Sequence, residues 1–381
     1  MKVAFAKPYL GHEEAQYAYD TILTSWVTQG PKVQEFEEKF AQRTGAKYAT
    51  AVSNCTTALH LAMIVAGIQA GDEVICPSMS YIATANCIRY VGATPVFAEV
   101  NEDYNIDPND VIAKITPKTK AILIVHQMGM PADIDAFKTI CEQHHLQLIE
   151  DAACAIGSSY KGKPIGQHSD LVCFSFHPRK VITTGDGGMI TTNRPDYDKR
   201  LKILRQHGMS VNDRARHEAK DLIFEDYEEV GYNYRMTDIQ AAVGIKQLER
   251  LDWFIEQRHQ TAKWYKEELN EIPHLQLPSH NEDFFTTYQS YSVLLKKGFP
   301  IERDALMRAL HQRGIATRRG IVLIHQQIAY QQEFSSVALP HSEYLSNQSI
   351  LLPMYVGLTQ AEIQYVCNTL KEIIQTIPSF S

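Results

Sequence analysis

The sequence predicts an α/β protein: a large domain with a mostly parallel, mixed sheet flanked by helices, followed by a smaller α+β C-terminal domain. Two observations lead to this prediction. Short apolar runs rich in β-branched residues alternate with segments of helical periodicity through the first two thirds of the chain, as in βαβ units. After about residue 275 this alternation gives way to a different mixture of strand-like and helix-like segments.

In the large domain, the predicted strands and helices follow one another in order. The strands are residues 47–53, 73–77, 120–126 and 146–151, and the helices between them are residues 56–68, 81–92 and 133–145. Asp107 and Pro108 form the pair expected at a helix N-terminus, a capping residue followed by proline. Polar residues follow each strand, and ligands of open α/β sheets bind beyond the carboxyl ends of the strands. We therefore expect these polar residues to share one crevice.

The C-terminal third has its own pattern. A long helical segment beginning at about Thr237 is expected to leave the large domain. Residues 291–298 are predicted to form a strand, and residues 303–314 and 359–374 are predicted to form helices. We therefore divide the chain into a large domain of residues 1–245 and a small domain of residues 246–381.

The overall composition and charge argue against several classes of function. The chain has 381 residues, of which 44% are hydrophobic and 21% charged, and its net charge is -7. Such a balance argues against general binding of nucleic acid or anionic membranes. Its seven cysteines contain no CxxC pair, which argues against a zinc site and a disulfide framework. Because no signal peptide or membrane-spanning run is evident, we expect a cytoplasmic protein.

The segment FSFHPRKVITTGDGGMITTN, residues 174–193, places Lys180 in a tight glycine-bounded loop between two strand-like runs. An ordinary loop lysine is solvated and protonated, but a lysine that is desolvated or near a cation becomes nucleophilic. Asp151 ends the strand LQLIED. A carboxylate there is often only a helix cap, but pyridoxal 5′-phosphate (PLP) requires an acid facing its ring nitrogen. Lys180 and Asp151 together match that requirement.

A phosphate-binding turn is expected between the first strand and its helix. Residues 53–57, SNCTT, offer backbone amides and the hydroxyls of Thr56 and Thr57 at a helix N-terminus. Plain N-capping is the alternative. Ser175 would add a hydroxyl, and Tyr81 would either stack on a cofactor ring or simply pack against neighbouring residues.

These segments resemble, in order and nearly end to end, the DegT/StrS-type nucleotide-sugar aminotransferases, PLP enzymes of fold type I. The similar segments include SWVTQGPKVQEFEEKFA, AVSNCTTALHLA, GDEVICPSMSYIATAN, IEDAACAIGS, SFHPRKVITTGDGGMITT and GYNYRMTDIQAAVG. The run SFHxxK followed by TTG[DE]GG is the most specific of them. The resemblance implies that Lys180 binds PLP covalently and that Asp151 faces the pyridine nitrogen.

The same resemblance assigns the remaining cofactor contacts. Thr56, Thr57 and Ser175 match the phosphate cradle, and Tyr81 matches the aromatic residue stacked on the ring. Asn233 matches an asparagine that reaches the phosphate from the other subunit, which implies a homodimer with shared active sites.

Cys154 departs from the pattern, because it stands where the family usually has Gln or His near the phenolic oxygen of the cofactor. A thiol is a weaker hydrogen-bond donor, so that contact is expected to differ.

Four further residues are weaker candidates for substrate binding. His177 is either a satisfied loop histidine or part of the sugar pocket. Arg318, Arg319 and His325 are suited to a substrate diphosphate, although a charged surface turn is an equal alternative.

The predicted reaction is amino transfer from an amino acid, expected to be L-glutamate, to a nucleoside-diphosphate keto-6-deoxy sugar at C4. Amination at C3 is the nearer alternative, and a non-catalytic regulator that kept the fold is the alternative from another class.

Overall fold

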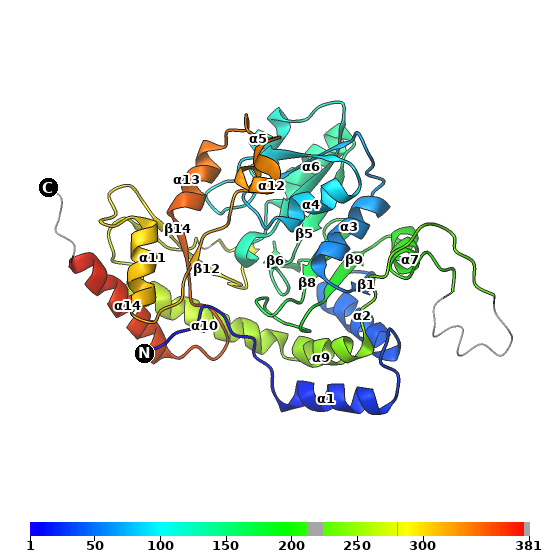
Figure 1. Ribbon diagram of the computed structural model, residues 1–381, viewed down its shortest axis with the longest axis horizontal. Helices are drawn as coiled ribbons and strands as arrows, with labels where there is room; N and C mark the ends of the chain where they lie inside the picture. The colour runs from blue at the N-terminus through cyan, green and yellow to red at the C-terminus, as the bar shows by residue number, and fades with distance from the viewer. Residues whose placement is uncertain (212–223, 280, 377–381) are drawn as a thin grey trace.

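The computed structural model describes residues 1–211, 224–279 and 281–376 (Figure 1). Within these residues the large sheet contains seven strands in the order β1-β9-β8-β5-β4-β2-β3. Their bounds are β1 (Tyr48–Val52), β2 (Glu73–Pro77), β3 (Thr94–Ala98), β4 (Thr119–Val125), β5 (Gln147–Asp151), β8 (Leu171–Ser175) and β9 (Gly188–Thr192). Strand β9 runs antiparallel to β8 and β1, whereas the pairs β5–β8, β4–β5, β2–β4 and β2–β3 are parallel. The predicted mostly parallel, mixed sheet is confirmed.

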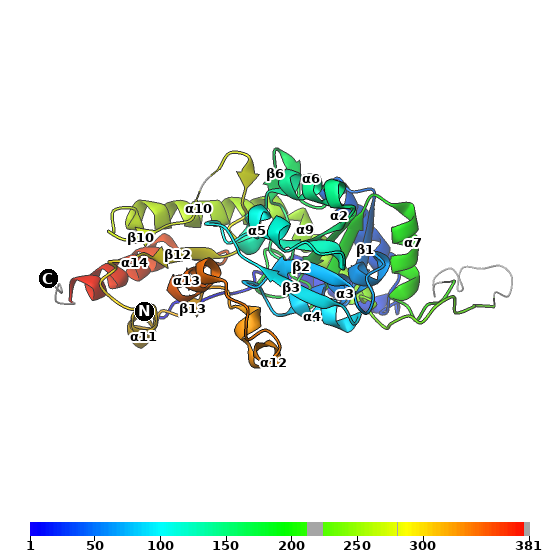
Figure 2. The same ribbon diagram turned by 90° about the horizontal axis from the view of Figure 1, so that it is seen from above.

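Helices cover both faces of this sheet (Figure 2). On one face lie α2 (Pro31–Thr44), α6 (Ile134–His144) and α9 (Asp238–Glu249), and on the other lie α3 (Cys55–Val65), α4 (Ala83–Tyr90) and α7 (Pro195–Leu204). Strand side chains alternate between the two cores: Ile122 and Ile124 pack on the first face, Ala121 and Leu123 on the second. This double coverage explains why the strands read as nearly continuous apolar runs.

A smaller antiparallel sheet organises the C-terminal part, in the order β10-β12-β14-β13. Its strands are β10 (Leu275–Gln276), β12 (Tyr291–Leu295), β13 (Arg318–Arg319) and β14 (Ser349–Leu352). The helices α10 (Leu251–Leu269), α11 (Arg303–Gln312) and α14 (Gln360–Gln375) share a hydrophobic core with it. The predicted α+β character of this part is confirmed.

The remaining elements are short or peripheral. They are α1 (His12–Leu23), α5 (Pro108–Ala113), the 3-10 turns η1 (Gln127–Gly129) and η2 (Ile324–Gln326), β6 (Ser159–Tyr160), β7 (Lys163–Pro164), β11 (Phe284–Phe285), α12 (Ile328–Gln331) and α13 (Pro340–Gln348). The predicted N-cap is confirmed, because the side chain of Asp107 accepts a hydrogen bond from the backbone N–H of Asn109 at 2.9 Å.

The chain crosses between the two parts more than once. The long helix predicted from Thr237 is in fact two helices, α9 and α10, with Arg250 between them. Along α10, Ile255 still belongs to the core of the large sheet, whereas Ala262 belongs to the core of the small sheet. At the other end of the chain, Val3 packs in the small core and its backbone pairs with residues 314 and 316. The division into two domains remains a proposal, with α10 as the connecting element.

Candidate active site

Three of the predicted residues meet at the carboxyl end of the large sheet. Asp151 is the last residue of β5, Cys154 comes three residues later, and Lys180 lies in the loop between β8 and β9. The Lys180 Nζ atom donates a hydrogen bond to the Cys154 Sγ atom at 3.2 Å. The charges of Asp151 and Lys180 each affect the pKa of the other residue. The fold therefore brings the lysine, the carboxylate and the unusual cysteine together.

The ionisation of this group reflects burial opposed by neighbouring charges. Burial raises the pKa of Asp151, and the Ala153 N–H, the charge of Lys180 and the Thr84 hydroxyl act against this rise. Burial lowers the pKa of Lys180, but the acidic groups of Cys154 and Asp151 outweigh it, so that the pKa is raised. The pKa of Lys180 is thus shifted upward, whereas a desolvated nucleophilic lysine is typically expected to have a lowered pKa.

The predicted phosphate cradle lies at the N-terminus of α3. Thr57 takes part in a capping box: its N–H donates to the Asn54 side chain at 2.9 Å, and its hydroxyl donates to the Asn54 carbonyl at 2.7 Å. Thr56 occupies the first turn of the same helix. Ser175 ends β8 and pairs with Gly188 of β9, and a Cβ atom on Gly188 would lie 2.5 Å from the Asn54 carbonyl. The glycine thus allows β9, which pairs with the strand that carries Ser175, to approach the helix terminus.

The α3 terminus also lies close to the lysine and the carboxylate. Burial and the charge of Asp151 raise the pKa of the Cys55 thiol well above its usual range, and the charge of Lys180 opposes this. Cys55 is the residue directly before Thr56. Tyr81 follows β2 and is 68% exposed, so its ring is free to contact a ligand at this edge.

Asn233 lies in an irregular, half-buried segment next to the same cradle. Its backbone forms an isolated bridge with Gln206, and the carbonyl of the next residue, Tyr234, accepts a hydrogen bond from the Ser53 N–H at 2.8 Å. The Asn233 side chain is exposed. Its contact with a cofactor in a second subunit stays a prediction.

His177 is exposed within the lysine loop, and its Nδ1 atom accepts from the Arg179 N–H at 3.2 Å. Burial and the charge of Arg179 lower the pKa of His177. The ring is therefore held by a hydrogen bond within the loop itself.

The predicted diphosphate residues fall into two places. Arg318 and Arg319 lie on β13 with exposed side chains, and Arg319 pairs with Asp304 of α11 at 3.1 Å. His325, in contrast, is buried, and its Nδ1 atom lies 2.6 Å from the Ser78 hydroxyl at the end of β2. Of the three, His325 is the residue that contacts a strand end of the large sheet, and burial lowers its pKa.

Three residues around the site, Thr84, Ser80 and Gln289, were not predicted from the sequence. Thr84 donates to Asp151, and Ser80 lies 2.7 Å from the Thr84 hydroxyl. Gln289 donates from its side chain to the carbonyl of Arg179, the residue before Lys180, at 2.7 Å. The spacing of Thr84, three residues after Tyr81 on a helical segment, was a usable signal, because residues three apart share a helix face. No comparable local signal existed for Gln289, which is 109 positions away from Lys180 in the printed sequence.

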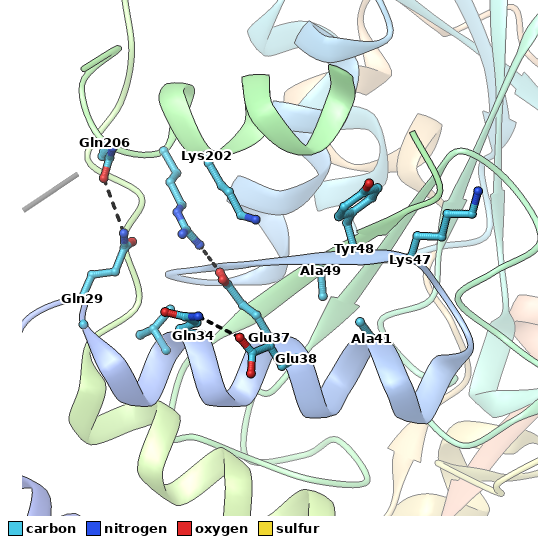
Figure 3. Close-up of a pocket in the computed structure, with 13 residues that line it drawn as sticks. Gln29, Gln34, Glu37, Glu38, Ala41, Lys47, Tyr48, Ala49, Lys202 and Gln206 are labelled. Atoms are coloured by element: carbon cyan, nitrogen blue, oxygen red, sulfur yellow. Dashed lines mark hydrogen bonds and ion pairs between the residues drawn. The ribbon is translucent and has the colours of Figure 1, made fainter. Parts of the chain in front are cut away.

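A cavity of about 290 Å³ lies away from these residues, between α2, β1 and α7 (Figure 3). The side chains of Gln29, Glu37, Tyr48 and Lys202 line it, and a buried ion pair between Glu37 and Arg205 forms part of its wall. The lining residues do not include the candidate site residues.

Within residues 1–211, 224–279 and 281–376, no helix is both long and apolar enough to span a membrane. The same residues contain no group of three or more His, Cys, Asp and Glu side chains that is placed to hold a metal ion.

The chain is similar to known proteins over nearly its whole length. Residues 8–371 match the DegT/DnrJ/EryC1/StrS aminotransferase family. The chain is 37% identical over 368 residues to GDP-perosamine synthase of Escherichia coli O157:H7, covering 96% of this chain and 97% of that protein. It is 38% identical over 381 residues to GDP-perosamine synthase of Caulobacter vibrioides, covering 98% of each. Among solved structures, the PLP form of the putative sugar aminotransferase Spr1654 from Streptococcus pneumoniae superimposes with a TM-score of 0.92 at 26% identity, covering 100% of both chains.

Proposed function

Because the chain belongs to the DegT/DnrJ/EryC1/StrS aminotransferase family, we propose that it transfers an amino group from L-glutamate to C4 of a nucleoside-diphosphate keto-6-deoxy sugar. It is a PLP-dependent nucleotide-sugar aminotransferase. The donor, the position of amination and the roles of individual residues are the proposed parts. A role as a non-catalytic regulator is disfavoured, because Lys180 and Asp151 are both present and lie in one site.

The observation that carries the residue assignments is the meeting of Lys180 and Asp151 beside the α3 terminus. The donor set fits PLP: an amine for the aldehyde, a carboxylate for the ring nitrogen, and helix N–H groups with hydroxyls for the phosphate. The close approach of Gly188 to Asn54 supports the cradle, because any larger residue would push β9, whose Gly188 pairs with Ser175, away from the α3 terminus.

In the proposed mechanism, bound PLP supplies an electron-withdrawing ring that stabilises the negative charge left when the α-proton of the donor is removed. Asp151 holds the proton at the ring nitrogen. The Lys180 Nζ atom would remove the α-proton of the donor and deliver it to the reacting carbon of the cofactor, and it would move a proton in the opposite direction during the second half of the reaction. Thr56, Thr57 and Ser175 would bind the phosphate, and Tyr81 would contact the ring.

The proposed acceptor follows from relatives and not from contacts in the site. Two relatives of 37% and 38% identity are named GDP-perosamine synthase, so we place a GDP-linked keto sugar first among the candidates. Amination at C3 is the alternative. We propose that His177 and His325 line the sugar side of the site, with Arg318 and Arg319 as weaker candidates for the diphosphate.

We further propose that the protein is a homodimer with shared sites. The apolar side chains of Phe224, Tyr227 and Val230 precede Asn233 and are 64–87% exposed, which suits a surface covered by a second copy. We propose a cytoplasmic location, which the seven free cysteines support because such thiols suit a reducing compartment.

The product assay decides the reaction. The enzyme and glutamate are incubated with GDP-, dTDP- and UDP-linked 4-keto and 3-keto 6-deoxy sugars, and the aminated product is identified by mass spectrometry and NMR. A 4-amino product supports the proposal, and a 3-amino product or no product contradicts it.

The Lys180→Ala variant tests the covalent role. Turnover should be abolished while the fold and noncovalent binding of PLP persist, because the lysine side chain supplies chemistry and not core packing. Turnover near that of the wild type would refute the assignment.

Sedimentation tests the shared site. PLP occupancy and dimer formation should rise together, and Asn233→Ala should weaken PLP binding. A monomer that binds PLP at full stoichiometry and turns over would contradict the dimer proposal.

A further inference from the structure

The carboxylate of Asp151 is held at both oxygens by the protein. Its Oδ1 atom accepts from the Ala153 N–H at 3.1 Å, and its Oδ2 atom accepts from the Thr84 hydroxyl at 3.1 Å. Asp151 ends β5, whereas Thr84 lies in the first turn of α4, after β2. Thr84 is fully buried and Asp151 nearly so. One hydrogen bond thus joins the end of β5 to the helix that follows β2, and β4 lies between β5 and β2 in the sheet.

The direction of this hydrogen bond extends to a third residue. An ionised carboxylate only accepts hydrogen bonds, so the Thr84 proton points to Asp151. The Ser80 hydroxyl lies 2.7 Å from the Thr84 oxygen, and Ser80 must therefore be the donor in that contact. The three buried groups form a directed chain, Ser80 to Thr84 to Asp151, in which each hydrogen bond polarises the next.

Helix capping does not account for the Thr84 hydroxyl. The N-cap residue of α4 is Ile82, and the cap has no side-chain hydrogen bond. The backbone N–H of Thr84 already donates to the Tyr81 carbonyl at 3.0 Å. The hydroxyl is instead directed at the carboxylate, with Ser80 behind it.

The hydrogen bond from Thr84 affects the ionisation of the Asp151 carboxyl group. Burial favours the neutral form of Asp151, and the Thr84 hydroxyl is one of the groups that favour the ionised form. Without this donor the pKa of Asp151 would rise further. A neutral or rotated carboxyl group would no longer hold a proton at the ring nitrogen of the cofactor.

We propose that Thr84, supported by Ser80, is a positioning residue that keeps the Asp151 carboxylate ionised and aimed at the ring nitrogen of PLP. This inference rests on the proposed function, because it assumes that Asp151 faces that nitrogen. Thr84 acts through Asp151 and does not itself take part in proton transfer.

The experiment measures the protonation of the PLP ring nitrogen. Protein prepared without cofactor is loaded with PLP labelled with ¹⁵N in the ring, and the ¹⁵N chemical shift is recorded as a function of pH for the wild type and for Thr84→Val, Thr84→Ser and Ser80→Ala. Valine keeps the shape of threonine without its hydroxyl, and serine keeps the hydroxyl. The pH dependence of the glutamate half-reaction is measured in parallel by stopped flow.

In Thr84→Val, the ring nitrogen should lose its proton at a pH lower by about one unit or more, as expected for the loss of a hydrogen bond to a charged group. The half-reaction should slow by about tenfold or more. Thr84→Ser should restore both properties, and Ser80→Ala should shift the titration in the same direction by a smaller amount. If Thr84→Val does not fold, as judged by thermal melting, the shift in Ser80→Ala decides.

An unchanged titration in Thr84→Val, or in Ser80→Ala where the valine variant does not fold, would overturn the inference. Asp151→Asn separates this failure from failure of the underlying assignment. If Asp151→Asn shifts the titration and Thr84→Val does not, the role of Thr84 is wrong and that of Asp151 stands. If neither variant shifts it, Asp151 does not face the ring nitrogen.

Discussion

Gly188 lies in close backbone contact with the turn that leads into the predicted phosphate cradle. Its φ angle lies outside the left-handed region, so alanine would fit the backbone conformation. The added Cβ atom, however, would lie 2.5 Å from the carbonyl carbon and oxygen of Asn54 and 2.8 Å from the Cys55 nitrogen. All three are backbone atoms that no rotamer change can move aside.

The expected losses of stability and of PLP affinity in Gly188→Ala follow from these distances. The two segments must separate by roughly 1 Å to restore ordinary contact distances. Overpacking of this kind costs about 1–3 kcal/mol of unfolding free energy. The same movement separates the α3 terminus from Ser175, and we expect the affinity for PLP to fall by about ten- to hundredfold, each tenfold being ~1.4 kcal/mol.

The assay is a fluorescence titration of the cofactor-free Gly188→Ala variant with PLP, together with urea unfolding without cofactor. Gly11→Ala is the matched control, because its nearest neighbouring atom would be 3.6 Å away, at an ordinary contact distance. The reasoning is refuted if Gly188→Ala binds PLP as tightly as the control does.

Two further predictions concern stability. Glu37→Gln should lower the free energy of unfolding by about 3–5 kcal/mol, since it removes the negative charge that pairs with the buried cation of Arg205. The control is Asp252→Asn, in an ion pair whose acidic side chain is 81% exposed, and it should cost only ~0–1 kcal/mol. Equal losses for the two variants in urea unfolding would contradict this prediction. The pKa of His325 is lowered by burial, so on acidification the unfolded chain binds a proton first, and stability is lost as the pH falls through the unfolded value of about 6.5. His325→Gln should therefore lose less stability than the wild type between pH 7.5 and 5.5, and parallel losses would count against this account.

Local patterns in the sequence were sufficient for the main elements and for the residue types of the site. The alternation of apolar runs and helical segments predicts the strands and helices of the large sheet, because a doubly covered sheet needs apolar side chains on both faces of each strand. Lys180 and Asp151 stand out because their residue types match the needs of one cofactor, and the motifs around them are specific.

Other features were decided only by tertiary packing. The insertion of β9 between β1 and β8 sets Gly188 beside Asn54, and strand order depends on long-range contacts that periodicity does not encode. The raised pKa of Lys180 arises because the fold places two acidic groups next to it.

The hydrogen bond from Thr84 to Asp151 shows the same limit. It joins residues 67 positions apart, and no local pattern in the sequence links the two side chains. A sequence pattern reports which side chains are buried, whereas the partner of a buried polar group depends on which strand ends the sheet brings together.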